Sequence, residues 1–335
     1  MTATHPTLAF SAHHTRWVGA LSLAQLISWG SVFYAFALLL APIESTLGMS
    51  RAESSLGFSL MLLAEGLLAF HVGRWIDQGH ERWVMTGGSL ILGLGLALHS
   101  DVHTATEFYA VWTLLGVGLA GTLYPPAFAV LTRRFAQHFR QAIIVLTFLG
   151  GLASTVFMPL VAGLMDALGW RTTLLVLGGL HLGICAPLHW HLLRNAPQHH
   201  MLDTAHHPKV FGRLVRQPRF AWLALFIVLL MGVTSALPAH MVSLLREAGM
   251  AEAWAIGVPA CIGILQVLGR LGLYLSERRV SVHTTNRWLP LLIPLGFAVL
   301  LFGQGHGFGA WFLWCCMAWA TARSPLSKAL WWRST

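Results

Sequence analysis

The chain has 335 residues, of which 56% are hydrophobic and only 10% are charged. With a mean hydropathy of +0.65, this balance excludes an ordinary soluble domain of the same length. Lys and Arg exceed Asp and Glu by 21 to 12. The basic residues lie in short gaps between apolar runs and form no basic face with aromatic residues, so no nucleic-acid partner is expected.

Ten apolar runs follow one another along the chain, and most approach the ~20 residues that a helix needs to cross a bilayer. We interpret them as transmembrane helices, so the predicted fold is an all-α polytopic membrane bundle. The runs cover residues 17–41, 56–75, 83–99, 108–131, 142–165, 172–193, 220–242, 253–275, 289–302 and 308–319.

A polar stretch divides these runs into two groups. Six runs precede it and four follow, an arrangement typical of transporters built from repeats. The sequence therefore predicts a six-helix N-terminal half (1–193), a cytoplasmic central loop (194–219), an incomplete C-terminal half (220–319) and an atypical tail (320–335).

The basic residues predict the orientation of the chain in the membrane. If each run spans once, 18 of the 21 Lys and Arg residues lie on one face, and only Arg51, Arg171 and Arg246 lie on the other. Lys and Arg are retained on the cytoplasmic side. The N-terminus is therefore predicted to be cytoplasmic, in a bacterial-type inner membrane. The residues before the first run are polar, and no small-residue cleavage site follows that run, so a cleaved signal peptide is not expected.

Glycines cluster within the runs, as at Gly93 with Gly95 and at Gly150 with Gly151. We expect these glycines, with Gly116, Gly118, Gly121, Gly178 and Gly179, to permit close approach between helices in lipid. No phosphate-binding loop, dinucleotide fingerprint or nucleophile–base pair is visible in the sequence. The chain is therefore not expected to be an enzyme or an ATP-driven pump.

Residues 73–82, between the second and third runs, read Gly-Arg-Trp-Ile-Asp-Gln-Gly-His-Glu-Arg. Gly73 permits a close turn, Asp77 can cap a helix and pair with a cation on a neighbouring helix, and Arg82 follows five residues later. This stretch resembles the loop signature of the major facilitator superfamily, and residues 133–135 and 168–171 support the resemblance. The resemblance implies a secondary transporter with a mid-membrane substrate site between its halves, gated on the cytoplasmic side by Gly73, Asp77 and Arg82.

Within the superfamily, residues 29–34 are similar to the monocarboxylate and oxalate–formate type. In the eighth run, Gln266 and Arg270 project from one helix face. Monocarboxylate transporters carry Asp and Arg at this spacing, and the Arg is taken to bind the substrate carboxylate. A guanidinium fork suits a carboxylate because it gives two parallel hydrogen bonds. The alternative is that Arg270 extends to the lipid headgroups.

Glu65 is the most costly residue of the first six runs, because an ionised carboxylate at mid-bilayer costs roughly 2.5–3.5 kcal/mol. We interpret it as a proton-coupling group that faces the bundle interior. The alternative is a protonated or paired Glu that only joins two helices. Trp29, Tyr34, Tyr124 and His240 complete the candidate substrate-binding residues. Tyr124 opens a Tyr-Pro-Pro sequence that interrupts a helix, and His240 lies at the outer end of the seventh run.

The 18 histidines include three adjacent pairs, and these pairs lie in the N-terminal tail and the central loop. No set of Cys, Asp or Glu completes a four-ligand zinc site with them, so no metal and no cofactor is expected. The four cysteines show neither metal spacing nor an extracellular pairing.

The function that fits these patterns is secondary active transport of a small organic anion, monocarboxylate-like, by a monomer in the lipid bilayer. Three alternatives stay open. Drug or metalloid efflux on the same fold would be favoured by a mainly aromatic cavity. The others are a truncated protein that senses or no longer transports, and a His-dependent membrane metalloenzyme.

The C-terminal residues indicate a truncation. Superfamily members usually have twelve spans, whereas ten runs are present here, and the small-residue pattern is lost after Trp314. Codons for residues 317–335 can be written with freely chosen synonymous third bases and then translated from one base earlier. The result is a glycine-rich apolar string of the kind expected for span ten. We hypothesise a frameshift near 314–317 that removed spans eleven and twelve. The alternative is a genuine short variant with a cytoplasmic tail.

Overall fold

The computed structural model describes residues 12–195, 217–276, 291 and 294–295. The described part contains helices and no strands, so the all-α prediction is confirmed. Six helical segments are long and apolar enough to cross a membrane: His14–Leu47, Arg51–Asp77, Ala105–Arg134, Phe139–Leu192, Pro218–Glu247 and Glu252–Gly272. The tenth run, nearly all of the ninth run, most of the central loop and the tail, with the frameshift hypothesis that concerns it, lie outside the described residues.

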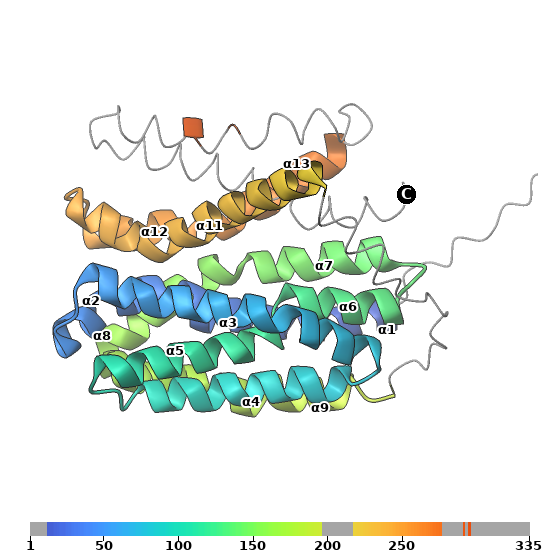
Figure 1. Ribbon diagram of the computed structural model, residues 1–335, viewed down its shortest axis with the longest axis horizontal. Helices are drawn as coiled ribbons and strands as arrows, with labels where there is room; N and C mark the ends of the chain where they lie inside the picture. Colours follow the sequence, from blue (N-terminus) through green and yellow to red (C-terminus); the bar gives the residue numbers. More distant parts are fainter. Residues whose placement is uncertain (1–11, 196–216, 277–290, 292–293, 296–335) are drawn as a thin grey trace, which may run out of the picture.

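Residues 12–195 form a bundle of long helices side by side, which we call the N-terminal bundle (Figure 1). Its elements are α1 (Ala12–Ser28), the π-helix η1 (Trp29–Tyr34), α2 (Phe36–Leu47), α3 (Arg51–Asp77), α4 (Glu81–His99), α5 (Ala105–Ala120), α6 (Tyr124–Arg134), α7 (Phe139–Gly151), α8 (Ala153–Leu180), the π-helix η2 (His181–Cys185) and α9 (Ala186–Leu192).

Local sequence signals set the helix ends of this bundle. Gly48 ends α2 in a left-handed conformation (φ +64°), which glycine adopts at no steric cost. Ser50 and Glu53 then form a reciprocal capping box that starts α3, and the Glu53 carboxylate accepts the Ser50 backbone N–H at 2.8 Å. Gly169 (φ +75°) interrupts α8. It therefore separates the fifth and sixth runs at the place that the sequence predicted.

Close glycine contacts hold α4 against its neighbours. A Cβ atom at Gly88 would lie 2.8 Å from the carbonyl oxygen of Gly118 in α5, and one at Gly178 would lie 2.8 Å from that of Gly93. Only glycine permits backbones to approach this closely, as the sequence predicted. Gly179 is an exception, because no atom lies within 4 Å of its Cβ position.

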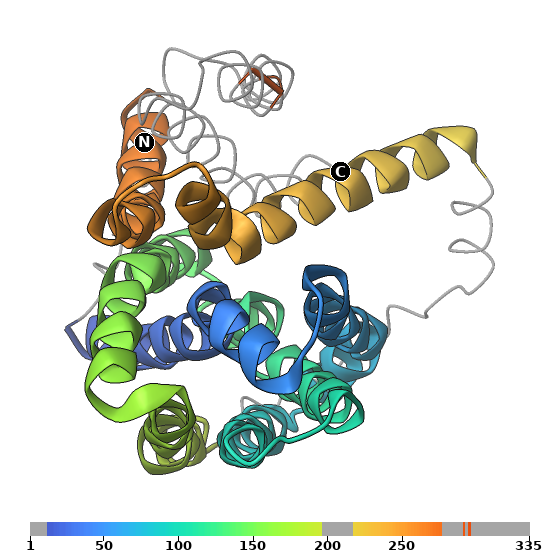
Figure 2. The same ribbon diagram turned by 90° about the vertical axis from the view of Figure 1, so that its left-hand side faces the viewer.

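Three further helices lie along one side of the N-terminal bundle: α11 (Pro218–Glu247), α12 (Glu252–Ala260) and α13 (Ile262–Ser276) (Figures 1 and 2). They contact α2, α7 and α8. Thr155 in α8 donates to the carbonyl of Ala260 at 2.7 Å. Arg51 at the start of α3 pairs with Glu247 at the end of α11, with 3.3 Å between Nη1 and Oε1. The two groups of helices are thus joined by polar contacts as well as by packing.

The basic residues of the two predicted faces lie at opposite ends of the helices. Arg51 begins α3 and Arg246 ends α11, and the Arg51–Glu247 pair joins these two ends. At the other end of the bundle, Arg134 ends α6 and donates to the carbonyl of Arg194 at 3.1 Å. These four arginines therefore lie at two opposite ends, whereas Arg270, which the prediction counts with the basic face, is buried within the folded chain.

Candidate functional site

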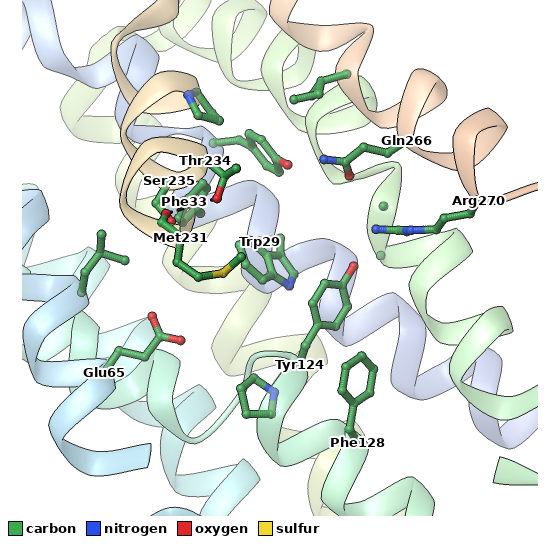
Figure 3. A pocket seen from close by; sticks show the side chains of 17 residues that line it. Trp29, Phe33, Glu65, Tyr124, Phe128, Met231, Thr234, Ser235, Gln266 and Arg270 are labelled. Carbon is green, nitrogen blue, oxygen red and sulfur yellow. Dashed lines mark hydrogen bonds between the residues drawn. The ribbon is translucent and has the colours of Figure 1, made fainter. Parts of the chain in front are cut away.

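A cavity of about 410 Å³ lies between the N-terminal bundle and helices α11–α13 (Figure 3). It brings together six of the seven predicted substrate and proton residues, which come from four separate elements: Trp29, Tyr34, Glu65, Tyr124, Gln266 and Arg270. His240 is the exception. Its ring lies instead 6.3 Å from that of Phe36, edge to face, so the outer end of α11 does not bring it to the cavity wall.

Aromatic rings form much of the cavity wall. The ring of Trp29 lies 5.0 Å from that of Phe33 and 5.2 Å from that of Tyr124. Tyr124 in turn stacks on Phe128, with 5.4 Å between ring centroids. Such spacings are favourable for aromatic pairs, so the rings hold one another in place. We call Trp29, Phe33, Tyr124 and Phe128 the aromatic wall.

The π-helix η1 supplies the first part of this wall. Its wider turn is visible in the bond from the Ala35 N–H to the carbonyl of Gly30, five residues back, at 3.1 Å. Short π-helical turns inside α-helices frequently occur at functional sites. Here the π turn carries Trp29, Phe33 and Tyr34 into the cavity.

A buried Ser–His contact lies within the bundle behind the aromatic wall. The Ser31 hydroxyl donates to the carbonyl of Ile27 at 2.7 Å, which uses its single proton. Its oxygen therefore accepts the second bond, 2.8 Å long, from Nε2–H of His181 in η2. The two π-helices are thus tied together. The sequence analysis did not find this pair, since its members are 150 residues apart and nothing in the sequence connects them.

Arg270 is buried, with 4% of its surface exposed, and it lines the cavity. Its Nη1 donates to the carbonyl of Thr147 in α7. Its Nε is also buried and has no hydrogen-bond partner in the described part of the chain. This position does not fit the alternative in which Arg270 extends to lipid headgroups. It leaves a buried N–H without an acceptor among the described residues.

Gly151 provides the space in which this guanidinium lies, because a Cβ atom there would be 2.6 Å from Nη1. We expect Gly151→Ala to displace Arg270 and to weaken carboxylate binding by at least about tenfold, or roughly 1.4 kcal/mol. Binding titrations on purified protein would measure this. Gly163→Ala is the matched control, since no atom lies within 4 Å of its Cβ position. Equal affinities in the two variants would contradict the prediction.

Glu65 lies across the cavity from Arg270 (Figure 3). Its carboxyl is partly buried in α3, and no described residue forms an ion pair or hydrogen bond with it. The structure therefore does not support the alternative in which Glu65 joins two helices through a bond. The carboxyl is available to a proton or a ligand.

The predicted gating residues lie at the end of the bundle where α3 meets α4. Asp77 is exposed, and Arg133 Nη1 donates to its backbone carbonyl. Arg82 donates from Nε to the carbonyl of Trp190 at 2.9 Å, and its guanidinium lies 3.3 Å from the centre of the Trp190 ring. Gly73 lies in the last turns of α3, with no atom near its Cβ position.

The buried acid at this end is Glu81, which the sequence analysis gave no role. Its side chain is fully buried, and Arg134 Nε donates to it at 2.6 Å. Arg133 Nε lies 3.7 Å from its other oxygen. The sequence signal that could have found it is the pair of arginines at the end of the fourth run. Two buried cations require an anion nearby.

Within the described ranges, no group of three or more His, Cys, Asp and Glu residues could hold a metal ion. The buried histidines contact serines or aromatic rings instead. Ser89 bonds His189 at 2.9 Å, and His99 lies among aromatic rings, 5.5 Å from that of Trp112.

A family model decides the classification. The model of the Major Facilitator Superfamily matches residues 21–331. The chain belongs to the Major Facilitator Superfamily. It is 24% identical to the uncharacterized MFS-type transporter YcxA of Bacillus subtilis over 73% of its own length and 60% of that protein. It is 28% identical to an MFS-type efflux pump of Mycolicibacterium smegmatis, over 85% of its length and 67% of the pump.

A shorter match links this superfamily member to the monocarboxylate transporters. Monocarboxylate transporter 13 of Rattus norvegicus is 37% identical over 31% of the chain and 25% of that transporter. Among solved structures, an inward-facing, unoccupied bacterial homologue of the human lysosomal transporter Spinster aligns with a TM-score of 0.68 at 18% identity, over 95% of the chain and 75% of the homologue. This likeness shows the fold of the superfamily.

Proposed function

We propose that the protein is a secondary active transporter of a small organic anion. The observation that carries this proposal is Arg270, a buried cation with an unpartnered Nε–H in the wall of a central cavity. Burying a guanidinium is costly unless an anion pairs with it. A substrate carboxylate would provide that partner and could form two parallel bonds with it. The partial match to a monocarboxylate transporter supports the same class.

The transport cycle would move the two groups of helices relative to each other around this cavity. The Arg51–Glu247 pair joins the two groups of helices at one end, so it would have to break if that end opens during the cycle. Gly73, Asp77 and Arg82 would act at the other end, where Arg133 already reaches the Asp77 carbonyl. We place the protein in a bacterial-type inner membrane, as a monomer.

The orientation can be tested with introduced cysteines. Arg74 and Asp101 are exposed at opposite ends of the bundle. Because Arg74 belongs to the basic face, we expect Arg74→Cys to resist an impermeant maleimide in intact cells and Asp101→Cys to react. The parent protein reports labelling of the native cysteines. The reverse labelling pattern would overturn the cytoplasmic placement of the N-terminus.

Glu65→Gln removes a titratable group at nearly constant shape. If Glu65 couples transport to protons, accumulation driven by a pH gradient should fall to background, while substrate exchange without a gradient continues. Both can be measured in the same proteoliposomes. Asp101→Asn, an exposed carboxylate at the end of α4, is the control. Unchanged accumulation in Glu65→Gln would show that this carboxyl does not couple.

Counterflow in proteoliposomes tests the transport proposal itself. Vesicles loaded with one member of a series of carboxylic acids should take up labelled acid, and Arg270→Ala should abolish this uptake. The second candidate function is efflux of aromatic drugs, which the aromatic wall and the similarity to an efflux pump favour. Uptake of ethidium but of no acid would replace the anion proposal with this one.

A further inference from the structure

Two oppositely charged side chains lie on opposite sides of the cavity and are not paired with each other. Figure 3 shows Arg270 on one side and Glu65 on the other, with Trp29 and Tyr124 between them in this view. A cation and a carboxylate in one small cavity would normally form an ion pair, because attraction is strong where water is scarce. Thr147 and Tyr124 contact Arg270, but neither supplies a negative charge, so each of the two charged side chains lacks an oppositely charged partner among the described residues.

At the Arg270 end of the cavity, protein contacts hold the guanidinium in a defined orientation. Nη1 donates to the Thr147 carbonyl, and Gly151 leaves room for the group. The buried Nε–H lacks an acceptor among the described residues. This end therefore requires an acceptor that carries negative charge.

At the Glu65 end of the cavity, the carboxyl lacks a hydrogen-bond donor. No described residue donates to its carboxyl, and Leu62 and Met231, which line the cavity with it, offer none. Thr234 and Ser235 line the facing side on α11, but the Thr234 hydroxyl donates to the backbone carbonyl of Leu230 at 2.9 Å. A carboxyl accepts a hydrogen bond from a hydroxyl whether it is ionised or protonated. A hydroxyl therefore suits this end in either state.

The space between the two ends is apolar and too large for the smallest acids. The aromatic wall lies between them, and aromatic or aliphatic surface packs best against such rings. A cavity of about 410 Å³ falls within the roughly 300–1,000 Å³ typical of sites that enclose drug-sized ligands. An acid of two or three carbons would leave one end unsatisfied.

We propose that the cavity binds a hydroxylated carboxylic acid with an aromatic or aliphatic middle, the carboxylate on Arg270 and the distal hydroxyl on Glu65. This rests on the proposed function, which places a carboxylate on Arg270. It goes beyond that function because it assigns Glu65 to substrate recognition and defines the substrate by its two ends.

Matched pairs of ligands test the inference on the purified full chain. Benzoate, phenylacetate and 3-phenylpropanoate vary the length, and each is compared with its 4-hydroxy and 4-methoxy derivative by titration calorimetry. At the length that fits best, we expect the hydroxy acid to bind at least about fivefold more tightly than the other two, as one hydrogen bond to a carboxyl allows. Methoxy keeps an oxygen at the same position but has no donor. Because it is one carbon larger than hydroxy, a gain is assigned to the hydrogen bond only where the hydroxy acid binds more tightly than both the methoxy acid and the smaller parent acid.

Variants then locate the effect. Glu65→Met removes the carboxyl and should bring the hydroxy-to-parent ratio of Kd values to about one, whereas Glu65→Gln keeps an acceptor and should retain a preference. Thr234→Val is the matched control on the opposite wall, and it should leave the ratio unchanged because its hydroxyl is already bonded to the backbone.

The outcomes distinguish this inference from the proposed function. Parent acids that bind through Arg270 with no gain from the hydroxyl at any length would overturn the inference alone. So would a preference that persists in Glu65→Met. If no acid binds, or if Arg270→Ala leaves all affinities unchanged, the proposed function fails as well. If Glu65→Met does not fold, the comparison of hydroxy with methoxy acids in the unaltered protein still decides whether a donor is recognised.

Discussion

Arg270→Ala is expected to lose nearly all carboxylate binding. Truncating one partner of a buried, hydrogen-bonded charge pair costs about 2–5 kcal/mol, which is at least about 30-fold in affinity. The guanidinium is 4% exposed and lines the cavity, so water cannot readily replace it. Titration calorimetry with an acid that binds the unaltered protein measures the loss directly.

Arg270→Lys is the more informative variant of the pair. It keeps the positive charge but loses the planar fork, so we expect an intermediate loss of about tenfold. Arg74→Ala, an exposed arginine near the end of α3, controls for a general effect of removing positive charge. If both Arg270 variants bind like the unaltered protein, Arg270 is not the anion site.

Either change at Arg270 also removes a bond to the Thr147 carbonyl, and this could lower stability without any role in binding. Thermal melting in detergent separates the two effects. Arg270→Ala should melt only slightly lower without ligand, but it should lose the stabilisation that a bound acid gives. A large loss of stability with ligand stabilisation retained would assign Arg270 a structural role instead.

The helices and their order could be predicted from the sequence because local signals specify them. Apolar runs of bilayer length predict the spans, and most capping and breaking residues act within a few positions. Gly169 was identified within a motif, and its positive φ separates the fifth and sixth runs. Pro125 and Pro126 occupy the first turn of α6, so the predicted interruption near Tyr124 is also present.

The candidate site could be predicted in part for a different reason. Gln266 and Arg270 are four residues apart, so one helix face brings both to the cavity. Exposing the Glu65 carboxyl to lipid would cost free energy, so the sequence predicts that this side chain faces the interior of the helix bundle. The helical periodicity of the sequence could not predict whether the His240 side chain faces the cavity. The sequence locates it at a helix end near the cavity, but its ring packs against Phe36.

Two specific contacts between distant segments were not predicted. The Ser31–His181 bond depends on two π-helical turns that face each other, and no propensity or period in the sequence specifies such turns. The Glu81–Arg134 pair was also missed, although the two arginines at the end of the fourth run indicate an anion nearby. The loop motif directed attention to Asp77 and Arg82. The acid that the fold buries is instead Glu81, which directly precedes Arg82 in the chain.

Glu81 therefore provides the second large prediction: Glu81→Gln should strongly destabilise the protein. The carboxylate is fully buried between Arg134, at 2.6 Å from Nε, and Arg133, at 3.7 Å. Removing its charge leaves two largely buried guanidinium groups without their anion. Breaking a buried pair on one side costs about 3–5 kcal/mol, so we expect a clear fall in the melting temperature of detergent-solubilised protein.

Glu247→Gln is the matched control, since it makes the same change in an ion pair at the opposite end of the helices. Glu247 is 67% exposed and lies 3.3 Å from Arg51, and exposed pairs contribute about 0–1 kcal/mol. The double variant Glu81→Gln with Arg134→Gln should recover part of the loss, because it removes the buried cation together with its anion. Arg133 keeps its bond to the carbonyl of Ile76 at 2.7 Å, so recovery should be incomplete. If Glu81→Gln melts no lower than Glu247→Gln, the buried pair does not stabilise this end of the bundle.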